Sequence, residues 1–450
     1  MDAANQTHFI IGENSAFIRF TGFIFDNPAS IRGSGMAARV RGDFVTFDNC
    51  TFRHIEEWVI GFGDDGSASK PARFGKFINN TVKDCFGDGC HVTYGEDVLI
   101  ANNVFDNLGD DGIGIVNDHG GARFPRRVKI IGNKIRNVQG CGVRIAGAEN
   151  VVFESNGIDI TEEDAIRVWN YAGHNCLNID VLNNTIRGAG DIIKPPTSTP
   201  VSHAIGLWNG SRIVVRGNSV FDCNNGCGIW MNTVDTCVIE ANSFRNCINT
   251  SGSINCIDIT SCYSLTIKAN VMLAITCQYL CYLNTTNTFL LSENTFSGCT
   301  LNGGSRVINL TGIGDSQINL NSILNCDAGA GIAMDGSARV QISHNQILTL
   351  NTSSYSRAIY MESANANSNV TISHNLIGRV ANEAIYINCT AGSSNYTNIF
   401  ITHNSTSEIG SGNYIYANNI ASGRAVLNSC SDASKTTGGS MSDKVYNTPA

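Results

Sequence analysis

Residues 98–105 read Val98-Leu99-Ile100-Ala101-Asn102-Asn103-Val104-Phe105, and residues 128–135 read Val128-Lys129-Ile130-Ile131-Gly132-Asn133-Lys134-Ile135. In both stretches an asparagine follows two apolar side chains, three and five positions earlier, and precedes a third, two positions later. An asparagine with an apolar residue three positions before it recurs along the chain, at Asn80, Asn103, Asn133, Asn156, Asn184, Asn218, Asn242, Asn270, Asn294, Asn321, Asn345, Asn375 and Asn404. The mean interval is about 27 residues, and self-similarity at a fixed period indicates a solenoid whose repeats bury apolar faces against each other.

Each repeat contains two short strands. One leads to the asparagine, and the other follows a turn of small or acidic residues, as in Gly112-Ile113-Gly114-Ile115. Alternating Val, Ile and Phe give the strand period, and 46 glycines against seven prolines indicate tight turns. The pattern predicts an all-β chain forming a single three-sided parallel β-helix of about 14–15 coils. We expect the asparagines to stack as a hydrogen-bonded ladder in a turn that tolerates left-handed backbone geometry.

The repeats extend over residues 17–430. A short lead-in, residues 1–16, precedes them, and a tail rich in Ser, Thr and Gly, residues 431–450, follows. We expect the tail to be flexible. Because repeat-like sequence begins at Phe17, close to Met1, we also expect the chain to be a fragment of a longer protein.

Composition excludes several classes of function. The net charge of −8 argues against a general nucleic-acid-binding surface, and no stretch is long and apolar enough to insert into a membrane. The spacing of the 17 cysteines indicates neither a zinc site nor a disulfide framework. Five of them lie five residues after a ladder asparagine, which predicts a column of small, buried, reduced side chains: Cys85, Cys223, Cys247, Cys299 and Cys326.

The strands of the second kind present an unusual outward face. The middle position of successive strands reads His91, Gly114, Arg144, Arg167, Gly206, Trp230, Asp258, Tyr282 and Asn309. A second row, two residues later, includes Trp169 and Trp208. Aromatic rings beside cations and carboxylates suit a sugar polymer, because sugars need ring faces to stack on and directional hydrogen-bonding groups. The alternative is packing of these aromatic residues against loops or a neighbouring subunit. Some intervals between ladder asparagines are long, and they place residues 63–73, 117–127 and 188–203 beside the same face. We expect these loops to form the walls of a groove.

Acidic residues crowd into consecutive repeats of this face, with Asp88 in one coil, Asp110 and Asp111 in the next, and Glu162 and Glu163 further on. Neighbouring coils lie about 4.8 Å apart, so the three aspartates should be close together. Like charges at that distance keep one proton bound and produce an acid beside a base, which is the arrangement for glycosidic hydrolysis. The alternative is that Asp-Gly is simply favourable turn chemistry.

The repeat resembles the right-handed parallel β-helix superfamily of pectate lyases, polygalacturonases and phage tailspikes, over nearly the whole chain. Polygalacturonases carry Asn-Thr-Asp-Gly, Gly-Asp-Asp-Cys, Gly-His-Gly and Arg-Ile-Lys on successive strands of this face. This chain has Phe86-Gly87-Asp88-Gly89 and then Gly109-Asp110-Asp111-Gly112. In place of the third motif stands Gly140-Cys141-Gly142, and Arg167-Val168-Trp169 keeps the arginine of the fourth but not its lysine.

The resemblance implies that Asp88, Asp110 and Asp111 are catalytic, with one carboxyl of Asp110 and Asp111 as general acid. His119 or His91 would replace the missing histidine. The substrate would be bound by residues of the face and its loops: His91, His119, Arg144, Glu162, Glu163, Arg167, Trp169, Trp208 and Trp230. Because the lysine binds the substrate carboxylate in that family, its replacement by Trp169 argues against galacturonate.

The function expected from these features is a polysaccharide-degrading glycoside hydrolase, specifically a homotrimeric phage tailspike depolymerase of capsule or O-antigen. It would be made in the host cytoplasm and act outside the cell on the virion tail; the alternative source is a secreted bacterial enzyme. Two other functions remain open. One is a polysaccharide lyase with an arginine or Lys129 as base, and the other is a non-catalytic sugar-binding fibre or adhesin. No cofactor is required, although calcium is compatible with the acidic cluster.

Overall fold

The structure is a computed structural model that describes residues 9–26, 35–63, 70–118, 123–189, 202–223, 226, 228–248, 254–350, 356–363, 367–389, 396–410, 413–418, 420, 423–430, 437–438 and 446–449. The regular structure of these ranges is β-strand except for one short 3-10 helix, η1 (Asn302–Gly304). In these ranges, no helix has the length and apolar character needed to cross a membrane. The chain divides into two compact units, unit 1 (residues 1–236) and unit 2 (residues 237–450).

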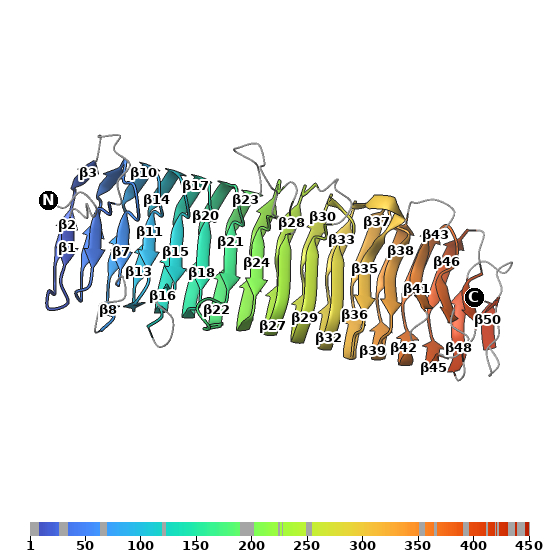
Figure 1. Ribbon diagram of the computed structural model, residues 1–450. Helices are drawn as coiled ribbons and strands as arrows, with labels where there is room; N and C mark the ends of the chain where they lie inside the picture. The colour runs from blue at the N-terminus through green and yellow to red at the C-terminus, as the bar shows by residue number, and fades with distance from the viewer. Residues whose placement is uncertain are drawn as a thin grey trace. The chain divides into compact units, whose positions relative to one another are not determined.

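Unit 1 consists of coils whose strands pair in parallel with the next coil, giving three stacks (Figure 1). Stack 1 contains β1 (Phe9–Ile11), β4 (Ala38–Val40), β7 (Ile60–Phe62), β11 (Cys90–Val92), β15 (Ile113–Val116), β18 (Val143–Ala146), β21 (Ile166–Trp169), β24 (Ile205–Trp208) and the beginning of β27 (Ile229–Glu240). Stack 2 contains β2 (Arg19–Thr21), β5 (Thr46–Asp48), β9 (Lys76–Ile78), β13 (Leu99–Ala101), β16 (Arg126–Ile131), β19 (Glu149–Glu154), β22 (Cys176–Leu182) and β25 (Gly210–Arg216), with the short β8 (Ala72–Arg73) and β12 (Gly95–Glu96) beside it. Stack 3 contains β3 (Ile24–Asp26), β6 (Thr51–Arg53), β10 (Thr81–Cys85), β14 (Val104–Leu108), β17 (Lys134–Val138), β20 (Gly157–Thr161), β23 (Thr185–Ala189) and β26 (Ser219–Phe221).

Unit 2 has the same three stacks. Stack 1 contains β29 (Ile257–Lys268), β32 (Cys281–Ser292), β35 (Arg306–Thr311), β38 (Ala330–Asp335), β41 (Arg357–Ser363), β44 (Ile385–Cys389), β47 (Ile415–Asn418) and β49 (Thr437–Gly438). The long strands β29 and β32 continue into stack 2, which also contains β36 (Asp315–Asn319), β39 (Ala338–Ser343), β42 (Ser368–Ser373), β45 (Thr397–Thr402), β48 (Gly423–Cys430) and β50 (Tyr446–Pro449). Stack 3 contains β28 (Ser243–Arg245), β30 (Val271–Leu273), β33 (Thr295–Ser297), β37 (Ser322–Cys326), β40 (Gln346–Leu350), β43 (Leu376–Val380) and β46 (Ser405–Ile409), and a separate pair is formed by β31 (Thr276–Cys277) and β34 (Thr300–Leu301).

The core of each unit is made of identical strand positions stacked on one another. In unit 1, Ile100 pairs with Ile130, Ile130 with Phe153 and Phe153 with Val181, and all four are fully buried. Burial of apolar area at about 25 cal/mol per Å² is therefore repeated coil after coil. The predicted cysteine column is also buried, at Cys85, Cys223, Cys247, Cys299 and Cys326, and the described cysteines are free thiols.

The asparagine ladder is confirmed in both units. In unit 1 the Nδ2 of Asn103 donates to Oδ1 of Asn133 at 2.9 Å, and in unit 2 Asn270 donates in the same way to Asn294 at 3.0 Å. Asn428 extends the ladder one position beyond the predicted set, because it accepts from Asn404 at 2.9 Å.

The expected backbone geometry at the ladder is wrong by one residue. The left-handed residue is the one before the ladder asparagine, for example Asn102 at φ 56° and Gly132 at φ 67°, while the ladder residues themselves have negative φ. This arrangement turns the asparagine side chain inward, where its amide meets the next coil.

The fold class is thus confirmed as an all-β parallel solenoid. Strand pairing begins at Phe9, inside the predicted lead-in of residues 1–16. Within the predicted tail, residues 431–450, the structure describes only residues 437–438 and 446–449, which form β49 and β50. The expected flexibility of the tail stays a prediction.

Candidate functional site

The predicted outward face lies on stack 1 of unit 1, and its register is confirmed. Strand pairing aligns one residue per coil: Gly61, His91, Gly114, Arg144, Arg167, Gly206 and Trp230. Three residues before each of the first six stands a further set, here called the entry column: Trp58, Asp88, Asp111, Cys141, Asp164 and His203. Because neighbouring coils are about 4.8 Å apart, side chains of one column can reach those of the next coil.

Close packing between coils explains the Asp-Gly sequences of this face. A Cβ on Gly89 would lie 2.3 Å from Cδ1 of Phe105, and one on Gly112 would lie 2.5 Å from the carbonyl oxygen of Gly142. Any larger residue after Asp88 or Asp111 would push the coils apart. The glycines therefore have a packing role that is separate from the chemistry of the aspartates.

The buried aspartates of the entry column also connect coils. Each accepts a hydrogen bond from a backbone N–H of the following coil: Asp111 N to Asp88 Oδ1 at 3.1 Å, Cys141 N to Asp111 Oδ1 at 2.7 Å, and His203 N to Asp164 Oδ1 at 2.6 Å. One oxygen of each carboxyl therefore binds the next coil at the turn between stacks 3 and 1, as the asparagine ladder does at the turn between stacks 2 and 3. The second oxygen is left for a side-chain partner.

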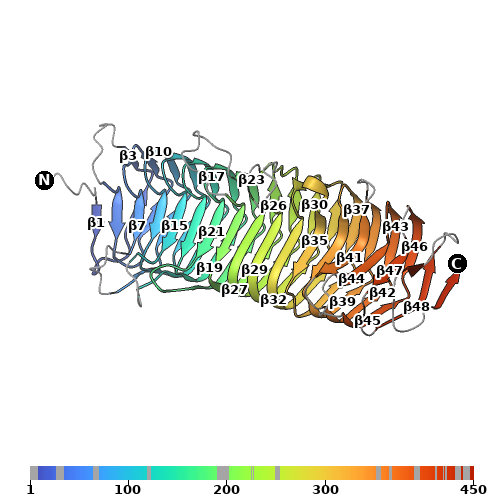
Figure 2. The same ribbon diagram turned by 45° about the vertical axis from the view of Figure 1, so that its right-hand side comes forward.

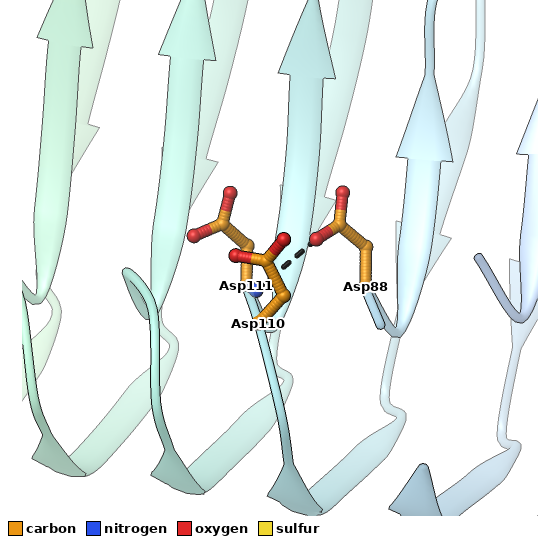
Figure 3. A group of neighbouring side chains, drawn as sticks. All are labelled: Asp88, Asp110 and Asp111. Atoms are coloured by element: carbon orange, nitrogen blue, oxygen red, sulfur yellow. Dashed lines mark hydrogen bonds between the residues drawn. The ribbon is translucent and has the colours of Figure 1, made fainter. Parts of the chain in front are cut away.

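The three aspartates that were predicted to be catalytic come together. Single oxygens of Asp88, Asp110 and Asp111 lie within 4.8 Å of one another (Figure 3). Asp88 and Asp111 are buried, whereas the Asp110 side chain is 53% exposed. Partial burial and the negative charge of Asp88 raise the pKa of the Asp110 carboxyl. An exposed carboxyl whose pKa is raised therefore stands beside two buried ones.

Asp111 is held by a guanidinium. Arg144 Nε lies 2.8 Å from Asp111 Oδ2, and the Arg144 NH2 group donates to Asp111 Oδ1 at 3.1 Å. Burial and the charge of Asp88 raise the pKa of Asp111, and Arg144 opposes them. Arg144 Nε and Asp111 Oδ2 form an ion pair at that distance but no hydrogen bond, so Oδ2 is buried without a donor. The Asp111 side chain is fully buried, so its oxygens are not accessible to a substrate.

His91 lies on the outward row but is buried. Its Nδ1 is 2.6 Å from Asp88 Oδ2 and its Nε2 is 2.8 Å from Asp118 Oδ2, while the Trp58 ring stacks on it with centroids 3.8 Å apart. Burial alone would lower the pKa of His91, but the hydrogen bonds to the two carboxylates outweigh it and raise the pKa to about 9. His91 is thus an imidazolium clamped between Asp88 and Asp118, 4% exposed and covered by an aromatic ring.

A second group of predicted residues surrounds Arg167. Its Nε donates to Asp164 Oδ2 at 2.8 Å and its NH1 group to Glu163 Oε2 at 2.7 Å. The guanidinium carbon also lies 5.9 Å from the centre of the Trp169 ring and 5.8 Å from that of Trp208. An arginine held this way presents a fixed positive charge between two aromatic rings.

His203 completes this group. Its ring stacks on Trp230 at 5.5 Å, and burial together with the charge of Arg167 lowers the pKa of His203 to about 3, so the imidazole is neutral. Its Nδ1 is buried and has no hydrogen-bond partner within the described ranges.

Two predicted residues are not brought into these contacts. The side chain of Glu162 forms no hydrogen bond or ion pair with any described residue, whereas its backbone N–H donates to Val138 O at 3.0 Å and its carbonyl oxygen accepts from Ser202. His119 lies outside the described residues, as do most of the loops that were expected to wall the groove.

Trp58 and His203 were missed as site residues. Both missed residues stand three positions before an outward-row residue, so counting back along every strand would have found them. The stacking of Trp58 on His91 had no such signal. A Cβ at Gly61 would lie 3.4 Å from the Trp58 ring, an ordinary van der Waals contact, so the stacking does not require a glycine at this position.

Comparisons with known proteins bear on the fold. A search of curated proteins finds no match. One similar solved structure is ORF18 of Geobacillus virus E2, with 15% identity over 67% of this chain and 55% of that chain and a TM-score of 0.38. Another is the surface adhesin PfbA of Streptococcus pneumoniae, with 11% identity over 83% of this chain and 84% of that chain and a TM-score of 0.42. A third is a mannuronic acid specific polysaccharide family 6 lyase from human gut microbiota, with 12% identity over 91% of this chain and 82% of that chain and a TM-score of 0.33. The chain thus spans about half the length of the viral protein. Identities this low are similarities of fold.

The profile described as "Right handed beta helix region" matches residues 8–124 and 115–296, which is more than half of the chain and includes the whole of the site just described. It agrees with the parallel coils and with the asparagine ladder. The chain belongs to the right-handed β-helix family.

Proposed function

We propose that this protein is a glycoside hydrolase that cleaves a polysaccharide on the stack 1 face of unit 1. The observation that carries the proposal is the group of Asp88, Asp110 and Asp111, with oxygens within 4.8 Å and one exposed member whose pKa is raised. Glycosidic hydrolysis needs one carboxyl that protonates the leaving oxygen and another that activates water or attacks the sugar.

The three aspartates take different roles in this proposal. Asp110 is the general acid, because it is the accessible carboxyl and its raised pKa favours the protonated form that an acid needs. Asp88 is the base: each of its oxygens has one donor, from Asp111 N or from His91, and a second lone pair remains on each for a water molecule. Asp111 is a positioning residue, since its side chain is fully buried, accepts a hydrogen bond from Cys141 N and is ion-paired with Arg144. A positioned acid and base contribute about 10²- to 10⁴-fold each.

The aromatic and cationic residues would bind the sugar chain next to the acids. Arg167 between Trp169 and Trp208, with Trp230 stacked against His203, offers ring faces and a fixed cation. His91 acts through Asp88 and Asp118, because Trp58 covers it. The hydrogen bond between its Nδ1 and Asp88 Oδ2, at 2.6 Å, orients the carboxyl that takes the role of base.

Calcium does not enter this mechanism. Calcium takes six to eight oxygen ligands, whereas two of the three aspartates here already bind backbone N–H groups and cationic side chains. The cations of Arg144 and His91 would also repel a metal ion at this point. The donor set therefore does not fit a calcium site.

The test is incubation with capsular, O-antigen and pectic polysaccharides while reducing ends and absorbance near 235 nm are followed together. Hydrolysis gives reducing ends without absorbance, and this activity should disappear in Asp110→Asn. Reducing ends with rising absorbance would mean elimination, a chemistry for which Arg144 and Arg167 are poor bases because carboxylates hold both charged. Binding without cleavage would indicate an adhesin or fibre.

A tailspike depolymerase on the virion tail, acting as a homotrimer, is the finer form of this proposal. It rests on the resemblance of the repeat to tailspikes and on the sugar-type face. A secreted bacterial enzyme would have the same site, so cleavage of capsule or O-antigen rather than pectin is the result that would favour the tailspike.

A further inference from the structure

Three histidines of unit 2 lie one above another at the turn that leads from stack 2 to stack 3. His344, His374 and His403 come directly after β39, β42 and β45, which pair in register and follow one another in Figure 2. Each stands one position before a ladder asparagine, and each is exposed whereas the asparagine is buried. These three residues, a third of the nine histidines of the chain, are here called the histidine column.

The rings of the histidine column are parallel and evenly spaced. The centroids of His344 and His374 are 5.0 Å apart and those of His374 and His403 are 4.8 Å apart, with interplanar angles of 4° and 6°. Within the described part of the chain, the imidazole nitrogens of the three residues make no hydrogen bond or ion pair, although the backbone N–H groups of His344 and His374 donate to the next coil. Each neutral imidazole therefore keeps one nitrogen lone pair that it can offer to a ligand.

The backbone of the turn does not by itself require histidine. The three residues have φ of 55° or 56°, in the left-handed region, and histidine is one of the residue types that tolerate this conformation. The same position holds Asn102, Gly132 and Leu320 in other coils. Left-handed geometry therefore explains why a histidine is allowed here, but not why three successive coils carry one.

The spacing of the histidine column suits chelation of a metal ion by neighbouring rings. Two histidines one turn apart on a helix bind a single zinc ion, although their Cβ atoms are about 5–6 Å apart. Neighbouring coils of this protein are no further apart, at about 4.8 Å. Two nitrogens on one ion stand roughly 3–4 Å apart when each metal–nitrogen bond is about 2.0–2.1 Å. The rings must therefore turn toward each other, which exposed side chains without hydrogen bonds can do.

The middle residue is needed for any such pair. His344 and His403 are separated by two coil spacings, about 9.6 Å, which is too far for both to bind an ion with bonds of about 2 Å. His374 can pair with either of them. Only one pair can form at a time, because both pairs would use the single lone pair of His374.

We propose that the histidine column binds one divalent transition-metal ion, such as Ni²⁺ or Zn²⁺, through His374 and one of its two neighbours. Imidazole nitrogen suits these ions, whereas Mg²⁺ and Ca²⁺ require oxygen ligands. Water completes the coordination, because the column is exposed. This site does not depend on the proposed hydrolysis, since it lies in unit 2 at the turn between stacks 2 and 3.

Isothermal titration of the full chain with NiCl₂ or ZnCl₂ tests the proposal, with MgCl₂ as the oxygen-preferring control. We expect one Ni²⁺ or Zn²⁺ per chain whose binding depends on His374, and no such binding of Mg²⁺. His374→Ala leaves two separate imidazoles and should weaken this binding about 100-fold, because the second bond is no longer intramolecular. His344→Ala or His403→Ala leaves one intact pair out of two and should weaken it only about twofold. Ions bound elsewhere in the chain, at thiols or other histidines, are common to all variants.

His54→Ala is the matched control. His54 is also exposed and left-handed, at φ 56°, but its ring is hydrogen-bonded to Asp26 at 2.8 Å, and its loss should leave the affinity unchanged. Thermal unfolding shows that each variant is folded. The proposal is wrong if neither Ni²⁺ nor Zn²⁺ binds, if the column takes up three equal ions, or if a folded His374→Ala variant loses no more affinity than the variants of its neighbours. Binding of half an ion per chain, with a doubled mass in light scattering, would also contradict it, because the ion would then join two copies.

Discussion

At the scale of single residues, Asp110 and Asp111 are neighbours in sequence but differ in every physical property. Asp110 is half exposed, and its nearest cation, Arg144, is 3.8 Å away, while Asp111 is fully buried and ion-paired. We expect Asp110→Asn to lower kcat about 10²- to 10⁴-fold with an unchanged melting temperature. Asp111→Asn should lose activity and also about 3–5 kcal/mol of stability, because it leaves the charge of Arg144 without a buried partner.

Measurement of kcat and of thermal unfolding on both variants checks this difference. Asp106→Asn, in an exposed ion pair with Arg136, is a matched control that should change neither quantity much. Equal destabilisation by both site variants would contradict the assignment of Asp110 as the free acid.

His91 predicts a dependence of stability on pH. Its pKa is raised from 6.5 to about 9, so its contribution to stability is fully present below pH 6.5 and is lost as the pH rises through 9. The difference corresponds to about 3 kcal/mol. Between pH 6.5 and 8.5 the free energy of unfolding should fall by part of this amount, measured by urea denaturation.

The His91→Gln variant is the control, since it cannot titrate and should show a smaller slope in the same pH range. The buried cysteines add a slope of the same sign, because thiols of the unfolded chain are already partly ionised below pH 8.5, so the difference in slope between wild type and His91→Gln is the measure of His91. A wild-type curve that is flat from pH 6.5 to 8.5 would show that His91 is not a buried imidazolium.

At the scale of elements, the asparagine ladder joins the coils of each unit. Asn270 accepts from Asn242 N at 2.9 Å and donates from Nδ2 to Ile239 O, also at 2.9 Å. Asn270→Ala would leave these buried backbone groups unpaired, at about 1–3 kcal/mol each. We expect a marked loss of stability in thermal unfolding, whereas Gln317→Ala, an exposed amide on β36, should stay within about 0.5 kcal/mol of wild type.

Elements also differ in how far they could be predicted. The register of stack 1 in unit 1, from His91 to Trp230, followed from sequence because the repeat keeps each residue at a constant offset from its strand. The offset determines which column a side chain occupies, but it does not determine the orientation of that side chain or the residues that it contacts. That is why His91 was expected to face a sugar and is instead covered by Trp58.

At the scale of the whole molecule, the resemblance to tailspikes predicts a homotrimer. Light scattering on the purified protein should then give three times the 48.2 kDa mass of the chain, at a concentration where the enzyme is active. A monomer that cleaves polysaccharide at full rate would contradict the trimer and would leave the hydrolase proposal unaffected.

The sequence by itself determined the period, the parallel β-helix, the asparagine ladder and the column in which each site residue stands. These properties repeat at every coil, so the sequence pattern that indicates each of them occurs many times along the chain. The tertiary structure decided which oxygens remain accessible, because that depends on contacts made once: Arg144 with Asp111, and His91 with Asp88 and Asp118. A repeat determines positions by periodicity, whereas ionisation and access are set by burial and by individual partners, which no period encodes.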